Sequence, residues 1–241
     1  MLNAGFHISQ FWDGRAKDLE EQAKGPVLNP LEMGMPNPEI VIIRLNTIPQ
    51  YVEEFEEVFK EDPNPVNYDN FAKAVAAFER TLVTPSRFDK FLNGDTDELT
   101  IKEKEGLQLF ISKGCVTCHN GVAIGGVMYQ KFGVVKSYTY QKDLGRYEIT
   151  KKEEDKYVFK VPSLRNVTRT YPYFHDGKVW DIREATKTMG EVQLGILLKE
   201  EEIDKIVAFL DSLTGEIPHD ALQLPVLPPS TPDTPKPTIG D

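Results

Sequence analysis

Cysteine and histidine are scarce in this chain, which has two cysteines and four histidines among its 241 residues. The cysteines are three positions apart, and no second pair of Cys or His residues at short spacing could complete a four-ligand structural zinc site. No apolar run reaches the roughly 18 residues that a membrane-spanning helix needs, so no membrane span is expected. The N-terminus, from Met1 to His7, also lacks the basic and then apolar character of an export signal.

Positive charge is also in short supply, because 28 lysines and arginines stand against 38 aspartates and glutamates and leave a formal net charge of -10. A surface of this sign repels phosphates, which argues against a nucleic-acid partner. It would attract a basic protein partner, although solubility alone accounts for the charge equally well, since a net charge does not define a patch. The length fits one large or two small domains, and a hydrophobic fraction of 40% supports a real core.

Both cysteines stand in the run Cys115-Val116-Thr117-Cys118-His119. On one helical turn, thiols three positions apart can form thioethers with the two vinyl groups of a haem while the next imidazole faces the iron. Besides zinc, the alternative is a thioredoxin-like redox pair, but that pair belongs in a βαβ setting and this run follows a strongly helical stretch. The motif therefore predicts a covalently attached c-type haem with His119 as an iron ligand.

Helical patterns dominate the rest of the chain, which predicts a mainly α fold with long loops. Thr100 and Glu103 form a capping box for a helix that leads into the haem motif, and an amphipathic helix over 200–213 should pack against it. Other helices are predicted over 18–23, from 38 to about 46, over 49–60, from 67 or 69 to 84, and from about 181 through Met189. An apolar stripe on the fourth predicted helix is expected in the core; it consists of Phe71, Val75, Phe78 and Leu82.

Three stretches are predicted to be mostly irregular, with only the short helix over 18–23 in the first of them. Residues 5–36 form a long ordered loop that could be an active-site wall, although Trp12 could simply anchor it and Glu32 could be solvated. Residues 120–165 are rich in glycine and carry β-prone pieces such as 134–140, which predicts loops with at most one weak hairpin. Proline and little apolar surface predict a disordered or extended tail over 225–241.

A cytochrome haem usually takes a sixth ligand from methionine or histidine. Two methionines are the strongest candidates, because Met128 follows His119 by nine residues and Met189 stands at a helix end that can fold back over the haem. A methionine near a helix end is also a common core filler, so the residues alone leave the choice open. The full set of candidates is His7, His175, His219, Met33, Met35, Met128 and Met189.

Several motifs in a fixed order resemble the bacterial di-haem cytochrome c peroxidase family, and the resemblance covers residues 2–224. The motifs are Phe11-Trp12-Asp13-Gly14-Arg15-Ala16, the run from Glu21-Gln22-Ala23 to Asn29-Pro30-Leu31-Glu32-Met33, the haem motif, Val161-Pro162-Ser163-Leu164-Arg165-Asn166-Val167, Tyr171-Pro172-Tyr173-Phe174-His175-Asp176-Gly177, and Met189-Gly190 followed by Gln193-Leu194-Gly195. The resemblance implies a C-terminal cytochrome c-like electron-transfer haem domain over 96–224, preceded by the remainder of an N-terminal, peroxidatic domain over 1–95.

The same resemblance implies roles for individual residues. Cys115, Cys118, His119 and Met189 would hold the electron-transfer haem. Trp12 would relay electrons between two haems, and Gln22 and Glu32 would line the peroxide pocket, with Glu32 transferring a proton. The backbone carbonyls of Thr170 and Pro172 fall where the family binds calcium.

The implied reaction is the reduction of hydrogen peroxide in the periplasm, with electrons from a small cytochrome c or a cupredoxin, and a homodimer is compatible with it. The chain departs from the family pattern because it begins just before the Phe-Trp-Asp-Gly-Arg motif, so the first haem motif, an upstream calcium ligand and the export signal are not in it. We therefore expect a peroxidase that is truncated as given, with a second haem in the full-length protein. The alternative is a stand-alone mono-haem electron-transfer protein without peroxidase activity.

Overall fold

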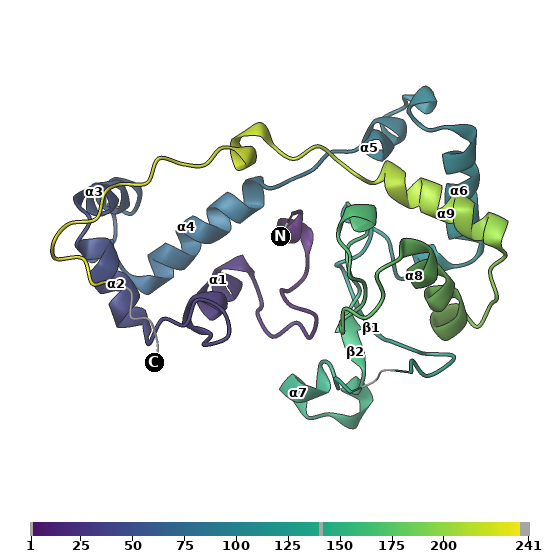
Figure 1. Cartoon of the computed structure of the whole chain (residues 1–241), viewed down its shortest axis with the longest axis horizontal. Helices are drawn as coiled ribbons and strands as arrows, with labels where there is room; N and C mark the ends of the chain where they lie inside the picture. Colours follow the sequence, from purple (N-terminus) through teal and green to yellow (C-terminus); the bar gives the residue numbers. More distant parts are fainter. Residues whose placement is uncertain (1, 140–141, 237–241) are drawn as a thin grey trace. The chain divides into compact units, whose positions relative to one another are not determined.

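The computed structural model describes residues 2–139 and 142–236, and these residues form a mainly helical protein, as predicted (Figure 1). No helix in this part of the chain is both long and apolar enough to cross a membrane. The helices are α1 (Leu19–Leu28), α2 (Pro38–Asn46), α3 (Pro49–Val58), α4 (Tyr68–Thr81), α5 (Arg87–Leu92), α6 (Ile101–Ser112), α7 (Tyr147–Thr150), α8 (Ile182–Met189) and α9 (Glu200–Ser212), and the strands are β1 (Tyr129–Lys131) and β2 (Val158–Lys160).

Local capping explains why several helices begin where the sequence predicts. Asn37 accepts a hydrogen bond from the Ile40 backbone N–H at the start of α2 (3.0 Å). Thr100 and Glu103 form the predicted capping box of α6. The carboxylate of Asp181 accepts from the backbone N–H groups of residues 183 and 184 at the start of α8. The short helices α5 and α7 were not predicted.

Strands β1 and β2 form a single antiparallel pair, in which Tyr129 lies opposite Lys160 and Lys131 opposite Val158. The two strands lie within the stretch predicted to carry at most one weak hairpin, but residues 132–157, including α7, separate them, and neither is at the β-prone piece 134–140. Residues 134–139 form no strand, and residue 140 lies outside the described residues.

The contacts divide the described chain into two compact units. Unit 1 consists of residues 2–17 and 82–218, and unit 2 of residues 18–81 and 219–236. Residues 2–17 and 82–95, predicted as part of the N-terminal domain, thus make their contacts within unit 1.

The core of unit 1 forms where α6 and α9 lie side by side, as predicted (Figure 1). Gly106 allows this close approach, because a Cβ atom there would collide with the carbonyl oxygen of Lys205 on α9. Phe209 packs its ring between those of Phe88 and Phe110, with centroid distances of 5.4 and 5.2 Å. The buried members of the core are Phe88, Leu99, Phe110, Ile124, Ile206, Phe209, Leu210 and Leu213.

A buried polar network attaches the N-terminal segment to unit 1. The Thr84 hydroxyl accepts hydrogen bonds from the side-chain amides of Asn3 and Asn166, both at 2.8 Å. Asn166 also accepts from the Gly215 backbone N–H at 2.9 Å. Because Asn3, Thr84 and Asn166 are at most 5% exposed, these bonds satisfy groups that water cannot reach.

In unit 2, α1 packs against α4 through short side chains. Ala72 and Ala76 are fully buried on α4, and Ala23 is buried on α1. The prediction that Phe71, Val75, Phe78 and Leu82 form a core stripe is wrong, since Phe78 is 55% exposed and the other three are only partly buried. The reason is that the helices meet through the alanine face, which brings the backbones close and leaves the larger side chains outside the contact.

The described part of the proline-rich tail, 225–236, contains no helix or strand but makes specific contacts within unit 2. The Arg44 guanidinium donates hydrogen bonds to the carbonyl oxygens of Pro235 (2.6 Å) and Lys236 (3.0 Å). The Thr231 hydroxyl donates to the carbonyl oxygen of Thr47 (2.9 Å). Residues 237–241 of the predicted tail lie outside the described residues.

Candidate haem-binding site

The haem motif follows directly from the end of α6. Gly114 adopts a left-handed conformation, with φ of 95°, which turns the chain out of the helix and favours glycine at this position. Residues Cys115–Thr117 then form one 3-10 turn, and the His119 backbone N–H donates to the Cys115 carbonyl oxygen at 3.0 Å. This 3-10 turn and the residue that ends it carry both thiols, and the imidazole follows directly, so the motif lies on about one helical turn as the spacing predicts.

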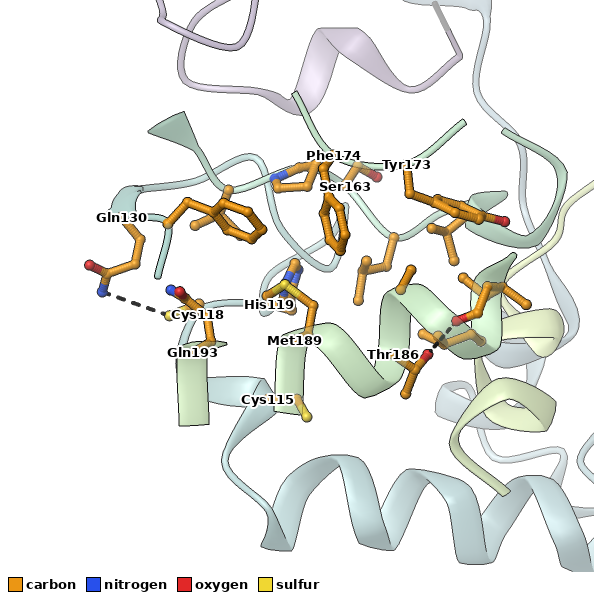
Figure 2. Close-up of a pocket in the computed structure, with 18 of the residues that line it drawn as sticks. Cys115, Cys118, His119, Gln130, Ser163, Tyr173, Phe174, Thr186, Met189 and Gln193 are labelled. Atoms are coloured by element: carbon orange, nitrogen blue, oxygen red, sulfur yellow. Dashed lines mark hydrogen bonds between the residues drawn. The ribbon is translucent and has the colours of Figure 1, made fainter. Parts of the chain in front are cut away.

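These side chains line a mainly apolar cavity of about 240 Å³ within unit 1 (Figure 2). Met189, the last residue of α8, lines the same cavity, and in Figure 2 its thioether is directed towards the space that His119 also faces. Trp12, in the N-terminal segment, also lines the cavity. The fold therefore brings Trp12 and Met189, which are both far from the haem motif in the sequence, to the same cavity as Cys115, Cys118 and His119.

Burial controls the protonation of the motif. Burial lowers the pKa of His119 to about 4, against the opposing effect of the backbone carbonyls of Pro162 and Ile124, so the imidazole is neutral near pH 7. Burial likewise raises the pKa of the Cys115 thiol to about 11. A neutral imidazole is the form that binds a metal, and a protonated thiol is a poor zinc ligand.

The residues of the cavity fit a c-type haem. Cys115 and Cys118 are not bonded to each other, so both thiols are free to form thioethers. The Nδ1 atom of His119 is buried and makes no hydrogen bond of normal geometry. Across residues 2–139 and 142–236, no group of three or more His, Cys, Asp or Glu side chains gathers as a metal site.

Among the seven candidate sixth ligands, Met189 and His175 line the cavity and the other five do not. Met33 is 67% exposed, and Met33, Met35 and His219 belong to unit 2. His7 is held elsewhere in unit 1, where its Nδ1 lies 3.2 Å from the ammonium nitrogen of Lys160. The cavity thus reduces the candidates from seven to two.

Aromatic rings form one wall of the cavity, and most of them were missed from the sequence. The His175 ring stacks on Phe159, and the rings of Trp12 and His175 are nearly perpendicular, with a centroid distance of 6.5 Å. Phe132 lies 5.0 Å from Phe174 and 5.5 Å from His175, again between ring centroids. Phe132 and Phe159 lie in or next to the short strands, so only the weak alternation of the strand pattern could have indicated them.

Four other predicted site residues belong neither to the haem motif nor to α8: the peroxide-pocket candidates Gln22 and Glu32, and the calcium candidates Thr170 and Pro172. Gln22 is half-buried on α1, and Glu32 is exposed in the turn after that helix, where its carboxylate accepts a hydrogen bond from the Asn29 amide at 2.7 Å. Both belong to unit 2, and neither lines the cavity of unit 1. Thr170 and Pro172, the predicted calcium ligands, lie in the loop before His175 and do line it.

Comparison with known proteins gives the family. The family description "Di-haem cytochrome c peroxidase" matches residues 1–97, and "Cytochrome c" matches residues 103–214. The chain is 50% identical over 238 residues to the cytochrome c551 peroxidase of Nitrosomonas europaea, covering 98% of this chain and 70% of that one. The chain belongs to the di-haem cytochrome c peroxidase family. Membership of this family implies haem c.

Two further similarities agree with this membership of the di-haem peroxidase family. The cytochrome c551 peroxidase of Pseudomonas aeruginosa is 47% identical over 242 residues, which cover 98% of this chain and 69% of that one. A crystal structure of a MauG-like protein associated with microbial copper homeostasis matches with a TM-score of 0.78 and 25% identity, covering 89% of this chain and 74% of that one. The cytochrome c-like fold that the sequence predicts is therefore confirmed.

Proposed function

We propose that this member of the family carries the electron-accepting haem of a peroxidase that reduces hydrogen peroxide to water. The observation that supports this most directly is the convergence of Cys115, Cys118, His119 and Met189 on one apolar cavity. The two thiols would attach the haem, and the imidazole and the thioether would take the two axial positions. When bound, a haem c with this ligand pair supplies a one-electron couple whose potential the methionine raises.

The proposal separates electron entry from peroxide chemistry. With His119 and Met189 as its two protein ligands, a haem in the cavity of unit 1 would offer peroxide no open position. Each peroxide needs two electrons and two protons to become two waters, and a small cytochrome c or a cupredoxin would supply the electrons. Trp12 is 39% exposed beside this cavity, which suits a relay that passes electrons on to a second haem.

Gln22 and Glu32 are the residues that we assign to the peroxide pocket. An exposed carboxylate such as that of Glu32 can exchange protons with solvent and deliver one to a leaving peroxide oxygen, which is typically worth about 10²- to 10⁴-fold in rate. We further propose a periplasmic location, a calcium ion bound by the backbone carbonyls of Thr170 and Pro172, and one covalent haem in this chain with a second in the complete peroxidase. A homodimer is compatible with these assignments.

A second candidate function is a stand-alone mono-haem electron carrier. The haem cavity of unit 1 supports it, because one haem held by His119 and Met189 is enough for one-electron transfer. The peroxidase proposal is preferred because a carrier has no use for the Gln22 and Glu32 side chains or for an aromatic relay at Trp12.

The test is to produce the chain in an export-competent host that has haem-maturation machinery. After acid unfolding, mass spectrometry should find one haem retained by the wild type and none by a variant with Cys115→Ala and Cys118→Ala. A small reduced cytochrome c should then reduce the wild type reversibly. Haem that dissociates freely from the wild type would refute the attachment.

The same preparation separates the two functions. Peroxide turnover that appears when a second haem-binding segment is joined to the N-terminus, and that Glu32→Gln depresses, would support the peroxidase. Reversible one-electron reduction without peroxide turnover, both in the chain alone and in the chain with the added segment, would support the carrier.

A further inference from the structure

Helix α8 does not stop at Met189 but changes into a π-helical turn over Gly190–Leu194 (η6). Single π turns are rare and occur most often at functional sites, because the wider turn redirects the side chains that follow. Gly190 is buried here, and its carbonyl oxygen accepts a hydrogen bond from the Ile196 backbone N–H at 2.9 Å. The turn therefore has a defined structure that places the residues after Met189.

Gln193 in this turn binds the loop that follows β1. Its side-chain oxygen accepts hydrogen bonds from the backbone N–H groups of Gly133 (2.6 Å) and Val134 (3.3 Å). Its side-chain nitrogen donates to the carbonyl oxygen of Lys131 (2.9 Å). One amide thus satisfies three backbone groups of a loop about 60 positions earlier in the sequence.

Backbone hydrogen bonds and an ion pair also join the π turn to the loop after β1. The Val192 carbonyl oxygen accepts from the backbone N–H groups of Val135 (3.0 Å) and Lys136 (3.2 Å). At the surface, the ammonium group of Lys136 lies 3.4 Å from the carboxylate of Glu191. We call this set of contacts between residues 131–136 and 190–194 the clasp.

The clasp connects two sides of the haem cavity. Met189 and Gln193 both line the cavity, one from the end of α8 and the other from the π turn (Figure 2). The loop on the other side of the clasp carries Phe132, whose ring packs on Phe174 and His175 in the aromatic wall. Movement of the Met189 segment away from the cavity would therefore have to break the bonds of Gln193.

We propose that Gln193 is a positioning residue that holds Met189 on the iron by fastening the π turn to the loop over 131–136. This inference rests on the proposed function, because it takes Met189 as the sixth ligand. A thioether is a weak, neutral ligand, so its retention depends on how firmly the protein holds it in place. Gln193 touches neither substrate nor iron in this account and acts through Met189.

The test compares three variants of the haem-loaded 241-residue chain. Gln193→Leu keeps the bulk of the side chain but leaves the three backbone groups without a partner. Gln193→Glu keeps an acceptor for Gly133 and Val134 and loses the donor to Lys131. Lys136→Ala is the matched control, because it removes only the surface ion pair between the same two segments, from a side chain that is 68% exposed.

Two readouts report on Met189 directly: the near-infrared band of the ferric thioether bond, and the affinity of the ferric protein for added imidazole. In Gln193→Leu we expect the band to weaken and imidazole to bind about tenfold more tightly, because imidazole competes with Met189 for the iron. A tenfold change corresponds to the net free energy of one or two hydrogen bonds. Gln193→Glu keeps two of the three hydrogen bonds but sets a carboxylate oxygen against the Lys131 carbonyl oxygen, so it should lie between Gln193→Leu and the wild type, and Lys136→Ala should match the wild type. If Gln193→Leu fails to fold, Gln193→Asn, which is one carbon too short to keep all three bonds, takes its place.

The outcomes distinguish this inference from the proposed function. A wild type without the thioether band would overturn the assignment of Met189 and the inference with it. A wild type with the band, together with unchanged band and imidazole affinity in both Gln193→Leu and Gln193→Asn, would overturn only the role of Gln193. An equal change in Lys136→Ala would also overturn it, since any loosening of the loop would then suffice.

Discussion

The imidazole of His175 lies flat against the phenyl ring of Phe159, with ring centroids 4.1 Å apart and an interplanar angle of 16°. This stack attaches the loop that carries His175 to strand β2. The Nε2 atom of His175 is buried without a hydrogen-bond partner, and burial is the main cause of the lowered pKa of this ring. His175 therefore stays, with Met189, one of the two candidate sixth ligands, and we propose that it serves as an aromatic surface in the cavity wall while Met189 binds the iron.

Replacing His175 by phenylalanine tests this assignment. His175→Phe keeps a flat ring on Phe159 and removes both ring nitrogens, so the near-infrared thioether band and the haem potential should stay as in the wild type. Relief of the buried unpaired nitrogen should leave the free energy of unfolding unchanged or raise it by about 1 kcal/mol. His175→Ala, which removes the stack, should lower it by about 1–3 kcal/mol. A wild type that lacks the band, together with a haem potential that changes in His175→Phe, would transfer the sixth-ligand role to His175.

The buried network around Thr84 should be a major source of stability in unit 1. Thr84→Val keeps the shape of the side chain but leaves the amides of Asn3 and Asn166 without their shared acceptor, which should cost about 2–4 kcal/mol. Thr81→Val is the matched control, because Thr81 is exposed and should cost about 0.5 kcal/mol or less. Urea unfolding of the haem-loaded protein measures both, and equal costs for the two variants would argue against the network.

The pair of Asp89 and Arg165 predicts a dependence of stability on pH. Burial alone would raise the pKa of the Asp89 carboxyl, but hydrogen bonds from Arg165 (2.6 and 2.8 Å) and Ser86 outweigh it and lower the pKa to about 2. Since the folded pKa lies below the ordinary value of 3.8, the stabilisation is complete above that value and is lost as the pH falls through it towards 2.

With allowance for solvent screening, this contribution amounts to about 1–2 kcal/mol. Asp89→Asn should therefore lower stability at pH 5 and should flatten the fall in unfolding free energy between pH 4 and pH 2. Urea unfolding at a series of pH values measures the slope. The same slope in the variant and the wild type would show that other carboxyl groups control acid unfolding.

Much of this architecture could be predicted because its signals are local. The caps at Asn37, Thr100 and Asp181 and the spacing of Cys115, Cys118 and His119 depend on residues within a few positions of one another. The prediction that the apolar stripe including Phe78 lies in the core was wrong for a physical reason. Periodicity shows which side chains share a helix face but not whether another element covers that face.

Contacts between distant segments gave no such signal. Lys160 would be expected at the surface, yet it is 5% exposed and its ammonium group donates to the Ser9 carbonyl oxygen at 2.9 Å. Burial lowers its pKa to about 8. The role of Gln193 was likewise hidden, because its three partners lie in a loop whose sequence shows only glycine and β-prone residues.

Peroxide turnover by this chain alone should be low, because its single haem motif would bind a haem with both axial positions filled by protein. Glu32→Gln should then leave both that residual turnover and the reduction of the haem by a small cytochrome c unchanged. Steady-state peroxide consumption and stopped-flow reduction measure the two. Efficient turnover that Glu32→Gln abolishes would require a peroxide-reactive haem in this chain and would contradict the separation of roles.

The most direct test of the account is the haem potential of Met189→His, measured by equilibrium redox titration together with the near-infrared spectrum. Replacing a thioether by an imidazole stabilises the ferric state, so the potential should fall and the thioether band of the wild type should disappear. An unchanged potential with the band intact would show that Met189 is not the sixth ligand. The electron-accepting site proposed for this cavity would then be wrong.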